Sequence, residues 1–399
     1  MTSLLLAIIY LTFISLGLPD GLLGAAWPVM HVDLSAPVAA QSVISIIISG
    51  CTIASSLLTA RLIARLGTGK LCTISVALTA IGIIGFSRVA AFWQLCLLAL
   101  PYGLGAGAID AALNNYVALH YGARHMNWLH CCWGVGASAG PVIMGWTLAG
   151  PTSWHGGYLI IGVAQVVITF TLLAALPLWK KEQETPDSTA SANEEPASAN
   201  NGTPSSNREL LRLPGAKAAI ASFGCYCALE GATGLWTASY LVIARGVQAD
   251  TAASIVSLFY IGITVGRLLA GFASGLLDSA RQIRVGQTLV ALGIICLILS
   301  PVEALLWVAI GLIGLGCAPI YPSIVALTPR RFGNQASQGL VSLQMACAYI
   351  GYTLAPPIFG LVANSDKAGA IPFLLLVLLV ANTAFAERAS ATAAGRQSR

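Results

Sequence analysis

The chain has 399 residues, of which 57% are hydrophobic and only 9% are charged, and its formal net charge is +5. A soluble domain carries about 25% charged residues, so this composition excludes a protein whose whole surface faces water. Apolar runs of about 18 residues or more recur along the chain, each long enough to cross roughly 30 Å of bilayer hydrocarbon as a helix. We therefore predict an all-α integral membrane protein that crosses the bilayer many times.

Twelve membrane-spanning helices are predicted, and they divide into two groups of six. Their expected positions are near 4–28, 38–60, 70–87, 92–118, 126–149, 156–178, 214–243, 251–275, 284–300, 303–327, 335–361 and 369–386. The only long polar segment lies between the sixth and seventh, and its Ser, Ala, Asn, Glu and Pro residues cannot build a core. We expect an N-terminal six-helix bundle at 1–180, a flexible cytoplasmic linker at 181–212, a C-terminal six-helix bundle at 213–388 and a cytoplasmic tail at 389–399.

The positive charges predict the orientation of these spans. Of the 20 Lys and Arg residues, 16 fall in the loops and tail on the side of the termini, three in the opposite loops and one within a span. This bias predicts that both termini are cytoplasmic, in the inner membrane of a bacterium. It also accounts for the net charge without a nucleic-acid partner.

The two halves resemble each other weakly in sequence, since TARLIARLGTGK follows the second span and ASGLLDSARQIR follows the eighth. Paired halves around a central cavity are a recurrent transporter plan.

The sequence contains short motifs that resemble enzyme signatures, but their context is wrong. Residues 136–140, GASAG, match a nucleophile elbow, which requires a strand–turn–helix, yet they lie inside a predicted membrane helix. Small residues that let helices approach closely are the better interpretation. The ten cysteines show no four-ligand zinc spacing and are expected to be free thiols. We predict neither an enzyme nor a metal site.

Four ionisable residues fall well inside predicted spans: Asp20, Asp110, Glu230 and Arg267. Placing an Asp or Arg in the middle of a membrane helix costs about 2.5–3.5 kcal/mol, so such residues face a cavity or a partner. We expect Asp20, Asp110 and Glu230 to take part in proton coupling. A structural alternative is a buried ion pair, for example between Glu230 and Arg267, that holds two helices in register.

Asp110 lies in a polar stripe on the fourth predicted span. Asn114 is four residues later and therefore lies on the same helix face, and Asn115 and Tyr116 follow it. Burial disfavours the charged form of a carboxyl group, so an acid in this position could bind and release protons near neutral pH. Asn114, Asn115 and Tyr116 could donate hydrogen bonds to a polyhydroxylated ligand.

Other spans supply further candidates for the same cavity. His130 and Trp133 are three residues apart, hence on one helix face, and His130 could pair with Asp110 or have a structural role. Trp and Tyr present flat faces that suit sugar rings. The further candidates for substrate binding are His130, Trp133, Trp236, Tyr321 (which lies between two prolines that interrupt a helix) and Gln344.

The basic loop RLIARLGTGK at 61–70 and the stripe of the fourth span resemble those of the major facilitator superfamily, and more narrowly its fucose-permease-like branch of sugar/proton symporters. The resemblance covers essentially all twelve spans and implies the two-bundle major facilitator fold. The loop departs from the signature of the superfamily at Ala64, where an aspartate is usual. We assign gating to Arg61, Arg65 and Gly67 of this loop and to Arg267.

The closer match lies in the fourth span, where the branch has an acid, an Asn four positions later and an aromatic residue at six. Asp110, Asn114 and Tyr116 fill these positions. Asp20, in the segment LGLPDGLL, matches an acid of the first span. His130 and Trp133 replace two amides of the branch. The resemblance implies that Asp110 and Asp20 are the protonated and sugar-contacting acids.

We therefore expect a proton-coupled symporter of a small polar solute, most simply a sugar or sugar derivative, that works by alternating access. Its partners would be that solute, protons and the lipid bilayer, with no cofactor besides protons and no nucleic acid, and we expect a monomer. The alternative is a proton-antiport exporter of drugs or metabolites, which would share the fold and the acids. A non-transporting sensor or intramembrane enzyme would carry a folded soluble domain or a reactive constellation, and the sequence contains neither.

Overall fold

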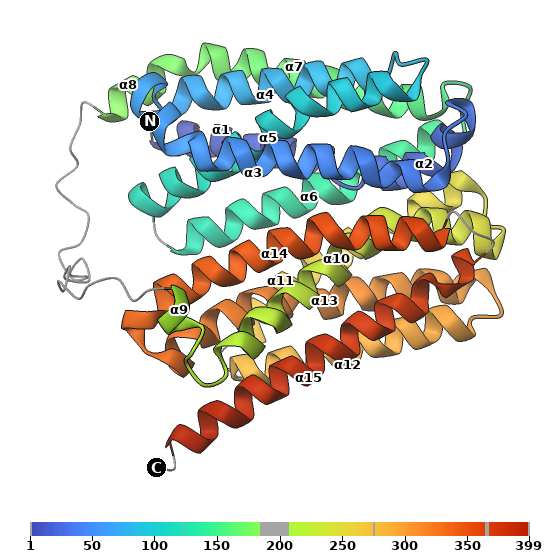
Figure 1. The fold of residues 1–399 in the computed structure, drawn as a ribbon. Coiled ribbons are helices and arrows are strands. Elements are labelled where there is room, and N and C mark those ends of the chain that lie inside the picture. The colour runs from blue at the N-terminus through green and yellow to red at the C-terminus, as the bar shows by residue number, and fades with distance from the viewer. Residues whose placement is uncertain (1, 122, 184–206, 274–275, 364–366, 398–399) are drawn as a thin grey trace.

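The computed structural model describes residues 2–121, 123–183, 207–273, 276–363 and 367–397, and every regular element in these ranges is helical (Figure 1). The elements are α1 (Thr2–Gly17), α2 (Leu22–Asp33), η1 (Val38–Ala40), α3 (Gln41–Leu66), α4 (Thr68–Phe86), α5 (Phe92–His120), α6 (Ala123–Leu148), α7 (Ser153–Ala174), α8 (Leu176–Gln183), α9 (Asn207–Leu210), α10 (Ala216–Arg245), α11 (Ala249–Ala273), α12 (Ser279–Leu299), α13 (Glu303–Phe332), α14 (Asn334–Ala363), η2 (Ala368–Ala370) and α15 (Ile371–Gln397). The predicted all-α class is confirmed.

Each of the twelve predicted spans corresponds to a long helix or, for the first span, to the helix pair α1 and α2. In the described residues, ten of these spans are long and apolar enough to cross a membrane. The two others are α6 and α10, which have 26 and 30 residues and are therefore long enough as well. They carry His130 with Trp133 and Glu230, respectively.

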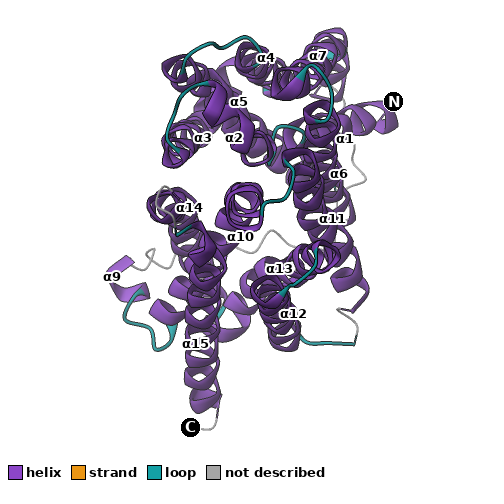
Figure 2. Cartoon of the chain, turned by 90° about the vertical axis from the view of Figure 1, so that its right-hand side faces the viewer, coloured by secondary structure: helices purple, strands orange, loops and turns teal. Residues whose placement is uncertain are grey.

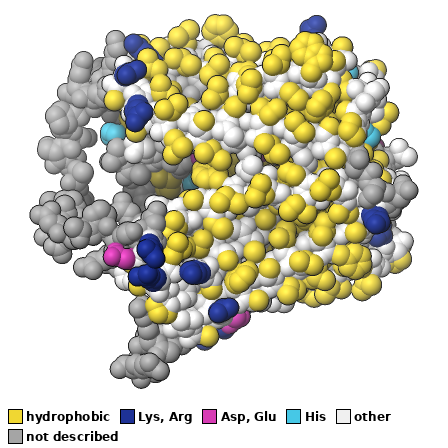
Figure 3. All heavy atoms as spheres, in the orientation of Figure 1, with side chains coloured by type: hydrophobic (Ala, Val, Ile, Leu, Met, Phe, Trp, Pro, Cys, Tyr) yellow, Lys and Arg dark blue, Asp and Glu magenta, His cyan; other side chains and the backbone are white. Residues whose placement is uncertain are grey.

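The helices form two bundles that lie side by side (Figure 2). Helices α1 to α7 make the N-terminal half and α10 to α15 the C-terminal half, each with its own hydrophobic core. The start of α1, the end of α15 and the short helices α8 and α9 all lie at one end of the molecule (Figure 1). The two ends of the predicted linker, 181–183 and 207–210, are helical, and its middle at 184–206 lies outside the described residues. The outer face is largely hydrophobic, with most visible Lys and Arg side chains toward the end of the termini (Figure 3).

The two halves are joined at the end opposite the termini. The Gln41 amide donates a hydrogen bond of 3.1 Å to the Leu235 carbonyl, and the Ser42 hydroxyl donates one of 2.9 Å to the Pro356 carbonyl. Close helix packing accompanies these bonds, because a Cβ added at Gly24 would lie 2.6 Å from the carbonyl oxygen of Gly234. The halves are therefore closely apposed at this end.

The first span is broken near its middle. Helix α1 ends at Gly17, a turn follows, and α2 begins at Leu22. Pro19 cannot donate a backbone hydrogen bond, and Gly21 has φ +78°, which side-chain-bearing residues rarely adopt. Non-helical backbone at membrane depth is tolerated where it is buried in protein or lines a cavity. The break places Asp20 there.

Candidate functional site

Asp20 lies at the break and is held by a side chain from another helix of its half. The indole Nε1 of Trp133, on α6, donates a 2.7 Å hydrogen bond to Asp20 Oδ2. Glycines make this possible, because a Cβ at Gly17 would collide with the Trp133 carbonyl and one at Gly136 with the Ile14 carbonyl. Helices α1 and α6 therefore touch backbone to backbone, and this contact brings the predicted residues Asp20 and Trp133 together.

Arg267 approaches the same indole from the other half. Its guanidinium carbon lies 5.3 Å from the centroid of the Trp133 ring, within the range of a cation–π interaction. The alternative in which Arg267 pairs with Glu230 is wrong for this structure. In the described part of the chain the ion pairs are Arg281 with Asp278 and Arg284 with Glu387.

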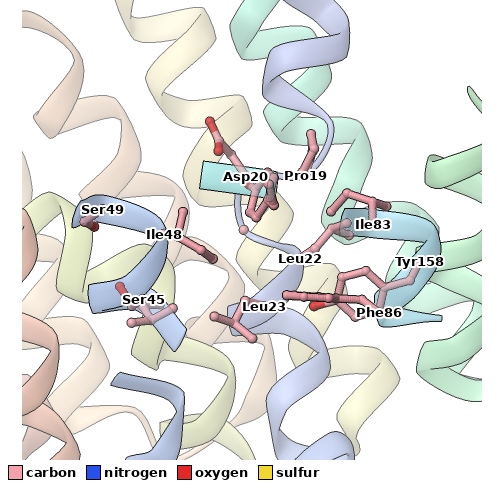
Figure 4. Close-up of a pocket in the computed structure, with 13 residues that line it drawn as sticks. Pro19, Asp20, Leu22, Leu23, Ser45, Ile48, Ser49, Ile83, Phe86 and Tyr158 are labelled. Atoms are coloured by element: carbon pink, nitrogen blue, oxygen red, sulfur yellow. The ribbon is translucent and has the colours of Figure 1, made fainter. Parts of the chain in front are cut away.

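A small pocket opens beside the break, with a volume of about 120 Å³. Figure 4 shows Asp20 at its edge, with Ser45 and Ser49 on one side and Phe86 and Tyr158 on the other. The Tyr158 hydroxyl lines this pocket and is buried without a hydrogen-bond partner in the described residues. A buried hydroxyl of this kind needs a water molecule or a ligand group. Pockets for drug-sized ligands are usually about 300–1,000 Å³, so a larger solute must also use the space between the halves.

The acid–amide stripe of α5 has the predicted local geometry. Asn114 Nδ2 donates hydrogen bonds of 2.9 Å to Asp110 Oδ1 and 3.0 Å to the Asp110 carbonyl. The prediction that these two residues share a helix face is confirmed. Asn115 is exposed. Tyr116, by contrast, is buried in the N-terminal half, where its ring stacks at 4.2 Å on His120 and meets Trp179 at 4.8 Å. The ring is packed there in this structure, and the contact of Tyr116 with a ligand stays a prediction.

His130 does not take the partner that the sequence suggested. Its ring lies edge-on to Phe13, with the ring centroids 5.9 Å apart, while Asp110 receives its hydrogen bond from Asn114. His130 is half-buried, one turn of α6 before Trp133. It therefore lies near the same level as Asp20 without contacting Asp110 directly.

In the C-terminal half, Glu230 on α10 is buried and accepts a 2.8 Å hydrogen bond from the Tyr352 hydroxyl on α14. Tyr321 is half-buried, with its hydroxyl 3.2 Å from the Met345 sulfur. The first contact joins α10 to α14, and the second joins α13 to α14.

Two predicted ligand-binding residues instead serve packing in this half. Trp236 is fully buried and donates a 3.1 Å hydrogen bond to the Pro356 carbonyl. Gln344 is buried and accepts one of 2.9 Å from the Thr328 hydroxyl. In this structure both polar groups are bonded inside the bundle, and the predicted ligand contacts of the two residues stay predictions.

The predicted gating loop is a tight turn between α3 and α4. Gly67 ends one helix and precedes the next with φ +77°, and a Cβ there would meet no atom within 4 Å. Arg61 and Arg65 are exposed on the last turns of α3. The glycine is thus required by backbone conformation rather than by crowding.

Sequence reasoning missed three tyrosines near the break. Tyr102 and Tyr158 line the small pocket, and the ring of Tyr260, from α11 of the other half, lies where a Cβ on Gly21 would approach it to 2.6 Å. No local pattern marks them, since a Tyr in an apolar helix is also typical of packing.

The sequence matches the family model of the Major Facilitator Superfamily over residues 9–248 and again over 218–390. No curated protein matches the chain. Among solved structures, a mutant of the nucleoside transporter NupG superposes with a TM-score of 0.73 at 14% identity, covering 96% of this chain and 98% of that one.

A bacterial homolog of the human lysosomal transporter Spinster also superposes with a TM-score of 0.73. Its inward-facing, occupied form is 13% identical and covers 98% of this chain and 97% of that one. Its inward-facing, unoccupied form is 14% identical, with coverage of 98% and 95%. At these identities the likeness concerns the fold alone.

Proposed function

Because the chain belongs to the Major Facilitator Superfamily, and is therefore a multi-pass membrane transporter of a small molecule, we propose that it is a proton-coupled symporter of a sugar or sugar derivative. The observation that carries this proposal is the half-buried carboxyl group of Asp20 at the broken first span, bound by Trp133 where the two halves meet. An acid at this position can exchange a proton only when the central space opens toward one side of the membrane.

We propose that the structure represents the state that is open toward the cytoplasm. The halves are joined at the end opposite the termini through Gln41 and Ser42. The charge bias predicts that the termini are cytoplasmic, in a bacterial inner membrane. The solved Spinster homolog is likewise inward-facing. The halves would then rock apart at the outer end to load solute and proton.

The substrate would lie between the halves, next to Asp20, Asp110 and Asn114. Hydroxyl groups of a sugar suit the carboxyl and amide groups of α5, and the half-buried Trp133 offers part of an indole face. Glu230 with Tyr352 supplies a carboxyl–phenol pair from the opposite half. These proposed contacts suit a function like that of the fucose-permease-like branch.

One observation favours the exporter as a second candidate. A groove of about 410 Å³ runs between α6 and α11, where the two halves meet, and its lining residues are mainly Val, Ile and Ala. The hydroxyls of Ser138 and Thr264 in it are bonded to carbonyls of their own helices. An amphiphile could enter such an apolar groove from the bilayer.

The test is uptake into proteoliposomes under an imposed inward proton gradient, with a panel of sugars and nucleosides. We expect one solute to accumulate with wild type, to fail with Asp110→Asn and to accumulate normally with Glu303→Gln, a control at an exposed acid. Equal accumulation in all three proteins would remove Asp110 from coupling. If no solute of the panel moves, the sugar assignment is wrong. Proton-driven extrusion of amphiphiles is then measured, and its occurrence would support the exporter.

A further inference from the structure

The contacts around Trp133 join the proton site of one half to a cation of the other. Its indole N–H donates to Asp20 at 2.7 Å, and the face of the same ring lies 5.3 Å from the guanidinium carbon of Arg267. We propose that Trp133 transmits the protonation state of Asp20 to Arg267, so that protonation loosens the contact between α6 and α11. This inference rests on the proposed role of Asp20 as a proton site.

The two contacts of the indole depend on the same charge. A hydrogen bond to an ionised carboxylate is shorter and roughly twice as strong as one between neutral groups. Donation to the carboxylate also draws negative charge toward the ring face, which strengthens its attraction for the Arg267 cation. When Asp20 binds a proton, the negative charge disappears and both contacts weaken together.

The packing around Trp133 makes the contact between α6 and α11 sensitive to this change. Glycines at 17 and 136 hold α1 and α6 backbone to backbone, so the two helices move as one unit. On the other side of α6, a Cβ at Gly134 would collide with the Thr264 side chain of α11. Because α6 is packed tightly on α1, a weaker attraction between Trp133 and Arg267 should loosen the packing of α6 against α11.

Other ionisable groups surround this contact. The charge of Asp110, on α5, acts on Asp20. Tyr102 from α5 and Tyr260 from α11 also lie within electrostatic range of Asp20. His130, on α6, lies within range of Arg267. Because interacting groups titrate together, the protonation of Asp20 has to be observed directly and not inferred from a pH–rate profile.

Infrared difference spectroscopy measures the protonation of Asp20 directly, through the absorption band of its protonated carboxyl group as the pH is changed. The band is assigned to Asp20 because it is lost in Asp20→Asn. Trp133→Phe keeps an aromatic ring for Arg267 but removes the N–H donor. We expect it to move the titration midpoint of Asp20 upward by about 1 pH unit. Arg267→Gln should shift the midpoint upward by a smaller amount. Arg267→Lys keeps the positive charge, so its midpoint should lie close to that of the wild type. Trp236→Phe removes a fully buried indole whose acceptor is a backbone carbonyl, and should leave the midpoint unchanged.

The double variant Trp133→Phe with Arg267→Gln distinguishes coupling through the indole from a direct effect of the Arg267 charge on Asp20. If the indole N–H couples the two groups, the double variant titrates like Trp133→Phe alone, whereas independent effects add. Additive shifts, or an unchanged midpoint in Trp133→Phe, would overturn coupling through the indole. If Asp20 does not titrate at all in the wild type, the proposed proton site itself fails, which is a different result.

Hydrogen–deuterium exchange at a single pH tests the mechanical half of the inference. Asp20→Asn imitates the neutral acid, so peptides of α6 and α11 around Trp133 and Arg267 should exchange faster than in wild type. Trp133→Phe should do the same, and combining both changes should add nothing further. Glu303→Gln neutralises an exposed acid in the first turn of α13 and is the control, so it should leave these peptides unchanged. Equal exchange in wild type and Asp20→Asn would contradict the proposal.

Discussion

Gly24 is the point at which a single methyl group should shift the balance between conformations. In Gly24→Ala, the new Cβ would lie 2.6 Å from the Gly234 carbonyl oxygen and 3.0 Å from that of Leu235. Ordinary Cβ contacts begin near 3.4 Å, so α2 and α10 must separate by some tenths of an ångström. Overpacking of this kind costs about 1–3 kcal/mol, which lowers the ratio of closed to open molecules at the end opposite the termini by about 5- to 150-fold.

Labelling of Ser45→Cys with a membrane-impermeant maleimide measures this population, because residue 45 lines the small pocket together with Leu235. The parent protein without the added cysteine gives the background of the native thiols. Gly24→Ala should speed labelling from that end of the molecule. Gly50→Ala is the matched control, because a Cβ there meets no atom within 4 Å. Unchanged labelling in a monodisperse, folded Gly24→Ala protein would refute the closed contact between the halves.

Three further changes have defined outcomes. Gln41→Ala removes a hydrogen bond between the halves and should speed the same labelling about 2- to 12-fold, whereas slower labelling would contradict the reasoning. Gly67→Ala should lower the thermal midpoint, since the backbone at φ +77° and ψ +157° costs an alanine about 1–3 kcal/mol, while Gly50→Ala in a helix should not. Equal midpoints in these two variants would argue against the strained turn. Arg284→Gln removes an exposed pair with Glu387 and should leave the thermal midpoint unchanged; a large loss would mean that the pair is structural.

Local geometry was predictable from the sequence where it depends on helix periodicity. The four-residue spacing of Asp110 and Asn114 predicted a shared face, and the 2.9 Å bond agrees with it. The same rule describes Tyr116, which lies six residues after Asp110, about 240° around the helix, and is buried in its own bundle. It does not separate Trp236 from Glu230, because Pro356 and Tyr352, their hydrogen-bond partners, both belong to α14.

Contacts between distant segments could not be predicted in the same way. Asp20 and Trp133 are 113 residues apart, and Glu230 and Tyr352 are 122 apart. Apolar helices are interchangeable partners as far as hydropathy is concerned, so composition fixes the number of spans and not which helices touch. The glycines at 17 and 136 decide the contact of α1 with α6, but a glycine in a membrane helix is compatible with many neighbours.

The central claim is that the acids of the N-terminal half carry protons together with the solute. The most direct measurement is solute-induced proton movement into proteoliposomes that contain a pH-sensitive dye, with no imposed gradient. Wild type should acidify the lumen when the transported solute is added outside, and Asp20→Asn and Asp110→Asn should not, although both still exchange labelled solute across the membrane. Solute entry without proton entry in the wild type would contradict proton coupling altogether.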